Sequence, residues 1–209
     1  FVTYRTPAEW KPDVETDAAT GFLNSLWLKD THDVVAFVKA WFGYCLTGLT
    51  QMQILVFMIG LGSNGKSKLS LVMENILGRV GFGHVTYEAL CQRTGGPNEE
   101  LFEARNARMW QVDENDGDQT LNFAQLKRIT GEDTIRVRQL YGHVVKVPSR
   151  AKINFCVNKA PKLPNCSDTK EQASLWRRFV YVDFPCQFVD FSESSKDREK
   201  IEALRREMS

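Results

Sequence analysis

Several common features are missing from this chain of 209 residues. It has no run of eighteen apolar residues and does not open on a secretory signal, so we expect no membrane span. No internal repeat or low-complexity tract is present. The cysteines are odd in number and form no CxxC pair, which argues against a disulfide framework or zinc site and for a reducing interior: Cys45, Cys91, Cys156, Cys166 and Cys186. The formal net charge is only +1, so the distribution of charge matters more than its total.

The length and composition fit one α/β domain with a small helical appendage. We expect three parts: an N-terminal arm and helical segment (residues 1–50), a core (residues 51–185) and the start of a C-terminal helical region (residues 186–209). The first thirty residues have the pattern of an extended arm, and a helix is expected from Thr31 to about Gly48. A first residue other than Met and an unfinished helix-like end are typical of a piece of a longer protein.

Four continuous apolar runs predict the strands of a central sheet. Continuous rather than alternating runs are typical of strands buried on both faces, as in a mostly parallel sheet flanked by helices. The stretch from residue 78 to residue 100 is rich in glycine and is expected to form loops with short elements. The expected strands are residues 54–59, 109–112, 153–157 and 179–184.

The first of these runs leads into GLGSNGKS, which fits the pattern G-x-x-x-x-G-K-S. Glycines allow backbone N–H groups to turn inward around phosphate oxygens, and the following helix presents its N-terminus to the negative charge. Lys66 would reach the β- and γ-phosphates of ATP, and the Ser67 hydroxyl would ligate Mg²⁺. An apolar helical face follows the loop, and Gly78 is placed to end that helix. The predicted nucleotide-binding residues are Gly60, Gly62, Ser63, Asn64, Gly65, Lys66 and Ser67.

An acidic pair follows the second run. Asp113 is assigned to the metal and Glu114 to the attacking water, and the reverse order is left open. Gln111 interrupts the apolar character of this strand. Asp116 and Asp118 fit a solvated acidic turn better than a site.

Positive charge is concentrated between residues 121 and 160, with eight Lys or Arg against two acids. This asymmetry is typical of a protein with a polyanion partner. Two strands around residues 141–143 predict a hairpin that contacts a nucleic-acid backbone and stacks on a sugar or base. An ordinary basic surface hairpin is the alternative. The predicted contact residues are Arg138, Tyr141, His143 and Lys146.

Polar residues also flank the last two runs. Asn158, at a strand end, would orient the attacking water, and Arg177 and Arg178 would stabilise charge on a transferring phosphoryl group in cis or from a neighbour. A structural Asn and surface ion pairs are the alternative.

Taken together, the strings GLGSNGKS, VDEND, LKRITGEDTIRVRQLYG, NKAP and LWRRFVYVDF resemble superfamily 3 helicases. The likeness is strongest to the helicase domain of primase–helicases from phages, plasmids and large DNA viruses, the poxvirus type. It runs from about Phe22 to Phe184, and the LK-to-LY stretch is its most specific part.

This resemblance implies an AAA+-like P-loop NTPase core that assembles as a hexameric ring and moves on single-stranded or forked DNA by hydrolysing ATP. It implies that Asn158 senses phosphate, that Lys127 or Arg128 is a further basic sensor and that residues 138–146 form a pore hairpin. Either Arg177 or Arg178, with Arg178 preferred, would reach the ATP of the adjacent subunit. A primase region would lie on the same full-length chain, at viral or mobile-element replication sites in the host cytoplasm or nucleus.

The sequence departs from this family because a primase half is missing and the expected helical lid stops near Ser209. Two other function classes stay open. A small-nucleotide kinase needs an arginine-rich lid, which residues 78–108 do not supply. A nucleotide-gated DNA-loading or scaffold module with little hydrolysis is disfavoured by Glu114.

Overall fold

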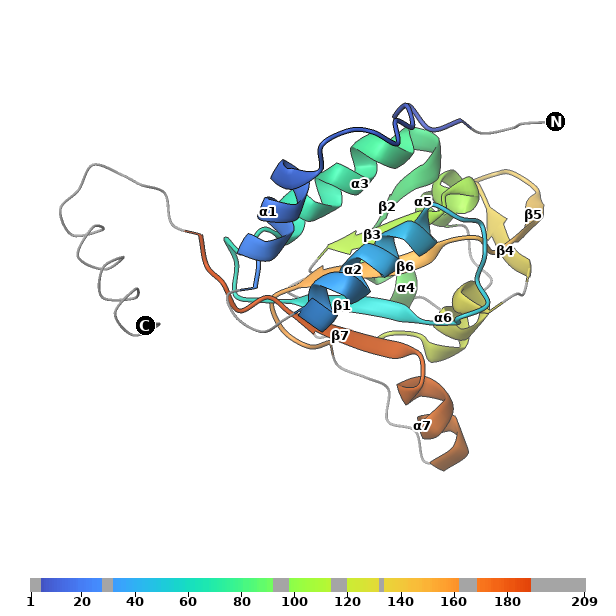
Figure 1. Ribbon diagram of the computed structural model, residues 1–209. Helices are drawn as coiled ribbons and strands as arrows, with labels where there is room; N and C mark the ends of the chain where they lie inside the picture. Colours follow the sequence, from blue (N-terminus) through green and yellow to red (C-terminus); the bar gives the residue numbers. More distant parts are fainter. Residues whose placement is uncertain are drawn as a thin grey trace, which may run out of the picture.

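A five-stranded sheet forms the centre of the computed structural model, which describes residues 5–27, 32–91, 98–113, 120–131, 134–161 and 169–188 (Figure 1). Its strands are β1 (Leu55–Ile59), β2 (Phe82–Val85), β3 (Met109–Asp113), β6 (Lys152–Val157) and β7 (Phe179–Asp183). They lie in the order β2-β3-β6-β1-β7, and all four neighbouring pairs are parallel. The predicted α/β class with a mostly parallel sheet is therefore confirmed.

Helices cover both faces of this sheet (Figure 1). Side chains alternate along a strand, so Val56 and Met58 of β1 face one core while Leu55 and Phe57 face the other. The first core is closed by α1 (Asp17–Ser25), α2 (His32–Cys45) and α3 (Lys66–Gly81). The second is closed by α4 (Tyr87–Cys91), α5 (Glu99–Glu103), a 3₁₀ turn (Ala104–Asn106), α6 (Phe123–Thr130) and α7 (Thr169–Trp176).

The four predicted strands are confirmed, the helix expected from Thr31 to about Gly48 is confirmed as α2, and one expectation is wrong. Residues 17–25 form α1 instead of continuing an extended arm. The short elements expected after residue 78 include β2 and α4. Helix α3 deviates where expected, since Gly78 has a φ of 64°. Most of the predicted C-terminal helical region lies outside the described residues.

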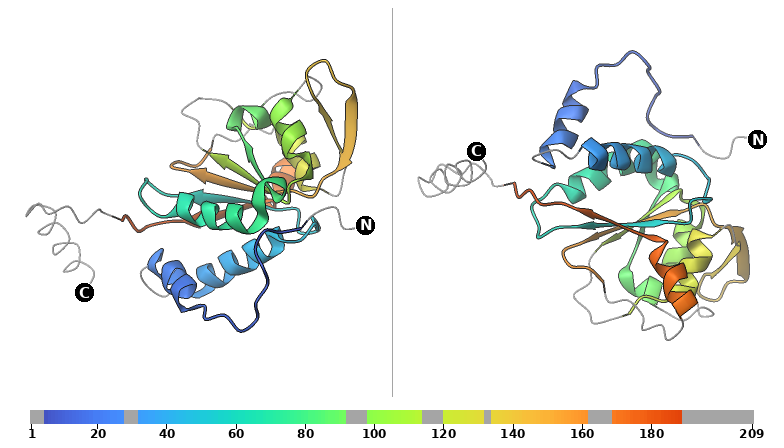
Figure 2. Two further views of the ribbon diagram at one scale, coloured as in Figure 1. Left: turned by 90° about the horizontal axis from the view of Figure 1, so that it is seen from above. Right: turned by 60° about the horizontal axis from the view of Figure 1, so that its bottom comes forward.

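A separate hairpin, β4 (Thr134–Arg138) and β5 (Val144–Pro148), projects from the end of the sheet opposite the loop that follows β1 (Figure 2). This confirms the predicted hairpin. Within the described residues, no helix is long and apolar enough to cross a membrane.

Candidate functional site

The carboxyl ends of β1, β3 and β6 meet at one edge of the sheet, here called the carboxyl edge, because the strands are parallel. Ile59 is in register with Val157, and Asp113 with Cys156. The loop of residues 60–65 therefore lies beside the strand that leads to Asn158, and Asp113 lies beyond it on the next strand. Polar groups at such an edge are well placed to bind a ligand. The predicted Glu114 lies outside the described residues.

The loop after β1 has the backbone of an anion cradle. Gly62, Ser63 and Gly65 have φ values of 96°, 48° and 84°, a conformation that turns successive N–H groups toward one side. Gly60 has to be glycine because a Cβ there would lie 2.7 Å from the Phe184 carbonyl oxygen. The N-cap residue of α3 is Gly65, which has no side chain to cap the first turn, and such a helix N-terminus suits an anion.

Lys66, the first residue of α3, extends its side chain back across this loop. Its Nζ donates to the Gly60 carbonyl at 2.6 Å and to Asn64 Oδ1 at 3.0 Å, and the residue is only 6% exposed. Asn64 is buried as well, and within the described structure its Nδ2 finds no acceptor. The ammonium is thus fixed inside the loop.

These groups fit a nucleoside triphosphate with Mg²⁺. Backbone amides and an ammonium suit phosphate oxygens, and a hydroxyl and a carboxylate suit the cation. Ser67 and Asp113 are both exposed and available for this purpose. No group of three His, Cys, Asp or Glu side chains capable of holding a metal occurs among the described residues.

Asp113 is held on its inner side by Gln111, the residue that interrupts the apolar run. Gln111 Nε2 donates to Asp113 Oδ1 at 3.1 Å. Its Oε1 accepts from Ser70 Oγ of α3 at 3.0 Å and from Asn154 Nδ2 of β6 at 2.9 Å. Sequence reasoning missed Ser70 and Asn154. Ser70 could have been noticed as a polar residue one turn after Lys66, and Asn154 as a polar residue inside an apolar run.

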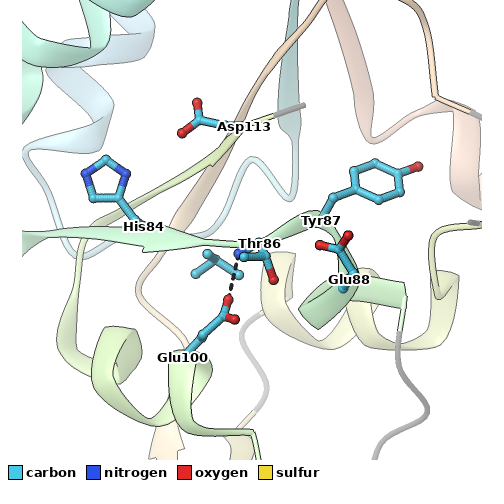
Figure 3. Close-up of a pocket in the computed structure, with 7 residues that line it drawn as sticks. His84, Thr86, Tyr87, Glu88, Glu100 and Asp113 are labelled. Carbon is cyan, nitrogen blue, oxygen red and sulfur yellow. Dashed lines mark hydrogen bonds between the residues drawn. The ribbon is translucent and has the colours of Figure 1, made fainter. Parts of the chain in front are cut away.

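On its outer side, Asp113 lines a cavity of about 390 Å³ at the ends of β2 and β3 (Figure 3). The Thr86 N–H closes part of the wall by donating to Glu100 Oε2 at 2.7 Å. Burial raises the pKa of Tyr87 to about 12, so its hydroxyl stays protonated. With Glu88 also in the wall, this flank of Asp113 is acidic.

The N-terminal segment supports the loop, a role that the sequence did not predict. Leu26 is fully buried against Gly65, and Trp27 Nε1 donates to the Asp183 carbonyl at 2.7 Å. The Trp27 ring also packs on Phe184 with a centroid distance of 4.8 Å. Residues just after α1 therefore join the loop to the edge strand β7.

The two predicted arginines lie just before β7 begins, at the end of the sheet opposite the carboxyl edge. Arg178 is 3% exposed, and burial lowers the pKa of its guanidinium, with a smaller effect from Arg177. It donates to the Ser174 carbonyl at 2.9 Å and to Gln53 Oε1 at 3.0 Å. The preference for Arg178 as the residue that reaches a neighbour is not supported, because its guanidinium is engaged inside the chain. Arg177 is the exposed member of the pair.

Lys127 and Arg128 are exposed on the last turn of α6, which packs against β4. Ser149, just before β6, donates to the Ile129 carbonyl, so this end of α6 lies near the start of β6. Asn158 follows the other end of that strand. The structure therefore does not bring these two basic residues to the loop of the same chain.

The hairpin presents its basic residues on one face. Arg136 is directly opposite Lys146, and Arg138 is opposite Val144. Tyr141 at the turn is 99% exposed with a φ of 60°, and His143 is exposed beside it. The face is positively charged and has an aromatic tip.

Residues 58–178, more than half of the chain, match a model described as a family of unknown function (DUF5906). The chain belongs to the DUF5906 family. The match includes the end of β1, the loop of residues 60–65, Asp113, the hairpin, Asn158 and both arginines.

Three curated relatives of this DUF5906 chain carry the name "Putative helicase". They come from Acanthamoeba polyphaga mimivirus (26% identical over 159 residues), Frog virus 3 isolate Goorha (27% over 143) and Invertebrate iridescent virus 6 (28% over 162). The alignments cover 75%, 66% and 71% of the chain but 16%, 14% and 16% of the relatives. The chain thus spans about one sixth of the length of these proteins.

Solved structures of the C-terminal region of NrS-1 share the fold. One apo form has a TM-score of 0.62 at 14% identity and covers 95% of this chain and 42% of the other. Another has a TM-score of 0.57 at 16% identity and covers 87% of this chain and 42% of the other. At this identity the likeness concerns the fold alone.

Proposed function

We propose that this chain is the ATP-hydrolysing motor domain of a DNA helicase from a viral or mobile-element replication protein. The observation that carries the proposal is Lys66, fixed inside a loop of left-handed residues at the sheet edge that also holds Asp113. The names of the three viral relatives support the helicase part.

In the proposed site, Lys66 and the amides of the loop and of α3 bind the β- and γ-phosphates of ATP. Ser67 and Asp113 hold Mg²⁺, which when bound neutralises charge on the phosphate oxygens. Glu114 accepts a proton from the attacking water, and Asn158 orients that water. Each role follows from the residue's chemistry and its position along the chain.

The hairpin is proposed as the DNA contact. Like charges directly opposite in an antiparallel pair destabilise it by roughly 0.2–1 kcal/mol, so Arg136 and Lys146 cost stability in the free protein. A phosphate backbone between them would offset this cost. The exposed Tyr141 offers a ring for a base or sugar to stack on.

We further propose that nucleotide sites are shared between subunits. Arg177 lies at the edge opposite the loop of its own chain, so it would serve the loop of a neighbour through a head-to-tail contact. Repeating that contact closes a ring, and the resemblance to superfamily 3 helicases favours six subunits.

The test compares Lys66→Ala with Lys68→Ala, an exposed lysine two residues further along the same helix. Binding of a fluorescent ATP analogue and release of phosphate are measured with and without single-stranded DNA. We expect Lys66→Ala to lose Mg²⁺-dependent nucleotide binding and Lys68→Ala to keep it. Equal binding by both variants, or no binding by the parent chain, would overturn the proposal.

Product analysis separates the alternatives. A kinase would transfer phosphate to a nucleotide instead of releasing it, and a DNA-loading module would bind DNA tightly with slow turnover. Mass measurement in solution, with and without an ATP analogue and an oligonucleotide, tests the ring.

A further inference from the structure

Four polar side chains lie buried between α3 and the sheet, directly behind the proposed site. They belong to α3, β3 and β6 and are surrounded by the apolar core that contains Met58, Met73 and Met109. Buried polar groups cost stability unless they are hydrogen-bonded, so a cluster here needs an explanation. Its members and their exposed fractions are Ser70 (7%), Gln111 (2%), Asn154 (0%) and Cys156 (7%).

Gln111 is the centre of the cluster, and the Asp113 carboxylate favours one orientation of its amide. Oε1 accepts from Ser70 and Asn154, while Nε2 donates to Asp113. If the amide were flipped, its oxygen would face the carboxylate oxygen of Asp113, and this contact would be repulsive. The cluster therefore fixes a donor on the inner side of Asp113.

The same cluster connects Asp113 to the phosphate loop. Ser70 follows Lys66 by four residues and lies one turn further along α3, on the same buried side. Gln111 and Asp113 are two residues apart and lie on the same face of β3. A single amide thus links the helix that begins at Lys66 to the carboxylate on the second strand from β1.

We propose that Gln111 is a positioning residue that holds the Asp113 carboxylate in the orientation needed to bind Mg²⁺ with the nucleotide. The proposal rests on the proposed function and adds to it a residue to which the resemblance assigns no role. Groups that orient metal ligands typically change metal affinity or activity by about 10–100-fold when they are removed. A purely structural glutamine would satisfy Ser70 and Asn154 without affecting the metal.

The test uses Gln111→Met, which keeps the side-chain length and removes the hydrogen bonds. The matched control is Gln125→Met, since Gln125 is also buried but donates to the Ala89 carbonyl at 3.1 Å on the opposite face of the sheet. Binding of a fluorescent ATP analogue is measured in EDTA and during a Mg²⁺ titration, and folding is checked by thermal melting.

We expect Gln111→Met to bind the analogue in EDTA as the parent chain does, but to need at least roughly tenfold more Mg²⁺ for half-saturation. Gln125→Met should match the parent chain. A Mg²⁺ requirement within twofold of the parent chain, or an equal rise in both variants, would overturn the inference. If Gln111→Met does not fold, Gln111→Asn carries the same test, because the shorter amide stays polar but cannot reach Asp113.

A double variant shows whether Gln111 acts through Asp113. With Asp113→Asn already present, adding Gln111→Met should leave the Mg²⁺ requirement unchanged, whereas independent effects would add. Normal nucleotide binding with an unchanged Mg²⁺ requirement in Gln111→Met would overturn this inference alone. Loss of Lys66-dependent binding in the parent chain would instead overturn the proposed function, and this inference with it.

Discussion

Replacing Arg177 and Arg178 separately by alanine distinguishes a structural arginine from one that serves a neighbour. Arg178 makes three hydrogen bonds, to the Ser174 carbonyl (2.9 Å), to Ser174 Oγ (3.3 Å) and to Gln53 Oε1 (3.0 Å). Gln53 Oε1 keeps a second donor, because Arg177 Nη2 lies 3.2 Å from it. The loss therefore falls mainly on the Ser174 contacts and on the packing of a buried side chain.

The expected cost follows from these contacts. A hydrogen bond to a charged group contributes about 1.5–3 kcal/mol, and water can replace part of it here, so Arg178→Ala should lose roughly 2–4 kcal/mol. In a domain of this size each kcal/mol lowers Tm by about 2–4 °C, which gives a fall of roughly 4–16 °C. Arg177→Ala removes one exposed contact and should change stability by no more than about 0.5 kcal/mol.

Activity should show the reverse pattern. An arginine supplied to a neighbouring phosphate site is worth on the order of 10³-fold or more in kcat, so Arg177→Ala should fold normally and lose ATPase activity. Mixing Arg177→Ala with Lys66→Ala chains should restore activity. A site is complete when an intact loop faces an intact Arg177, and random mixing gives roughly one such site in four.

Thermal melting and phosphate release at several protein concentrations measure both effects. The reasoning would be refuted if Arg178→Ala kept the parental Tm but lost activity, while Arg177→Ala stayed fully active. An inactive mixture, in which both variants still bind nucleotide and assemble, would refute sharing of the site.

Three further predictions follow from the site and its surroundings. Gly65→Ala should weaken nucleotide binding and lose at least roughly 1–2 kcal/mol, because its φ is 84° and a Cβ there would lie 2.4 Å from Leu26 Cδ2. Gly21→Ala, in α1 with open space around it, should be neutral or stabilising in the same melting and binding assays. Lys146→Glu turns a repulsive pair with Arg136 into an attractive one, so it should raise hairpin stability by a few tenths of a kcal/mol. It should also lower DNA affinity and the salt dependence of that affinity. Unchanged DNA binding would contradict the hairpin assignment. Burial lowers the pKa of Lys152 from 10.5 to about 8, so the unfolded chain binds more protons above pH 8. The free energy of unfolding should therefore rise by about 1 kcal/mol from pH 8 to pH 9 relative to Lys152→Met, and denaturant titrations that show no such difference would contradict this pKa.

The strands that the sequence predicted are those whose apolar residues are continuous. β6 is buried at every position and β1 at four of five, so most of their residues are apolar on both faces; Lys152 and Asn154 of β6 are the buried exceptions. β2 was expected only as an unspecified short element, because it has four residues, one of them a glycine and one the exposed His84. α1 was missed because none of its residues is buried, and it docks mainly through the segment that follows it.

Within the site, residues named by a local pattern were predictable and residues defined by pairing between elements were not. The loop and Asp113 are read from spacing along one segment. Gln111 appeared to be a defect of its strand, because the two groups that donate to it come from α3 and β6 and depend on a register that the sequence does not contain. For the same reason nothing in the pair Arg177-Arg178 indicates which member turns inward toward Ser174.

The separation of functional groups between two edges of the sheet explains why one chain would be incomplete as a motor. The loop and Asp113 lie at the carboxyl edge, whereas Arg177 and the hairpin lie at the other. The five residues of β7 alone span about 13 Å at roughly 3.3 Å per residue, so Arg177 cannot reach the loop of its own chain. In a head-to-tail assembly, Arg177 of one chain would lie near the carboxyl edge of the next chain and could reach its loop. β6 is buried at all six positions and connects Asn158 to the hairpin through only three residues, 149–151. A motor built this way would hydrolyse ATP at the contact between chains and hold DNA on the hairpins, so that assembly, nucleotide turnover and DNA binding would depend on one another.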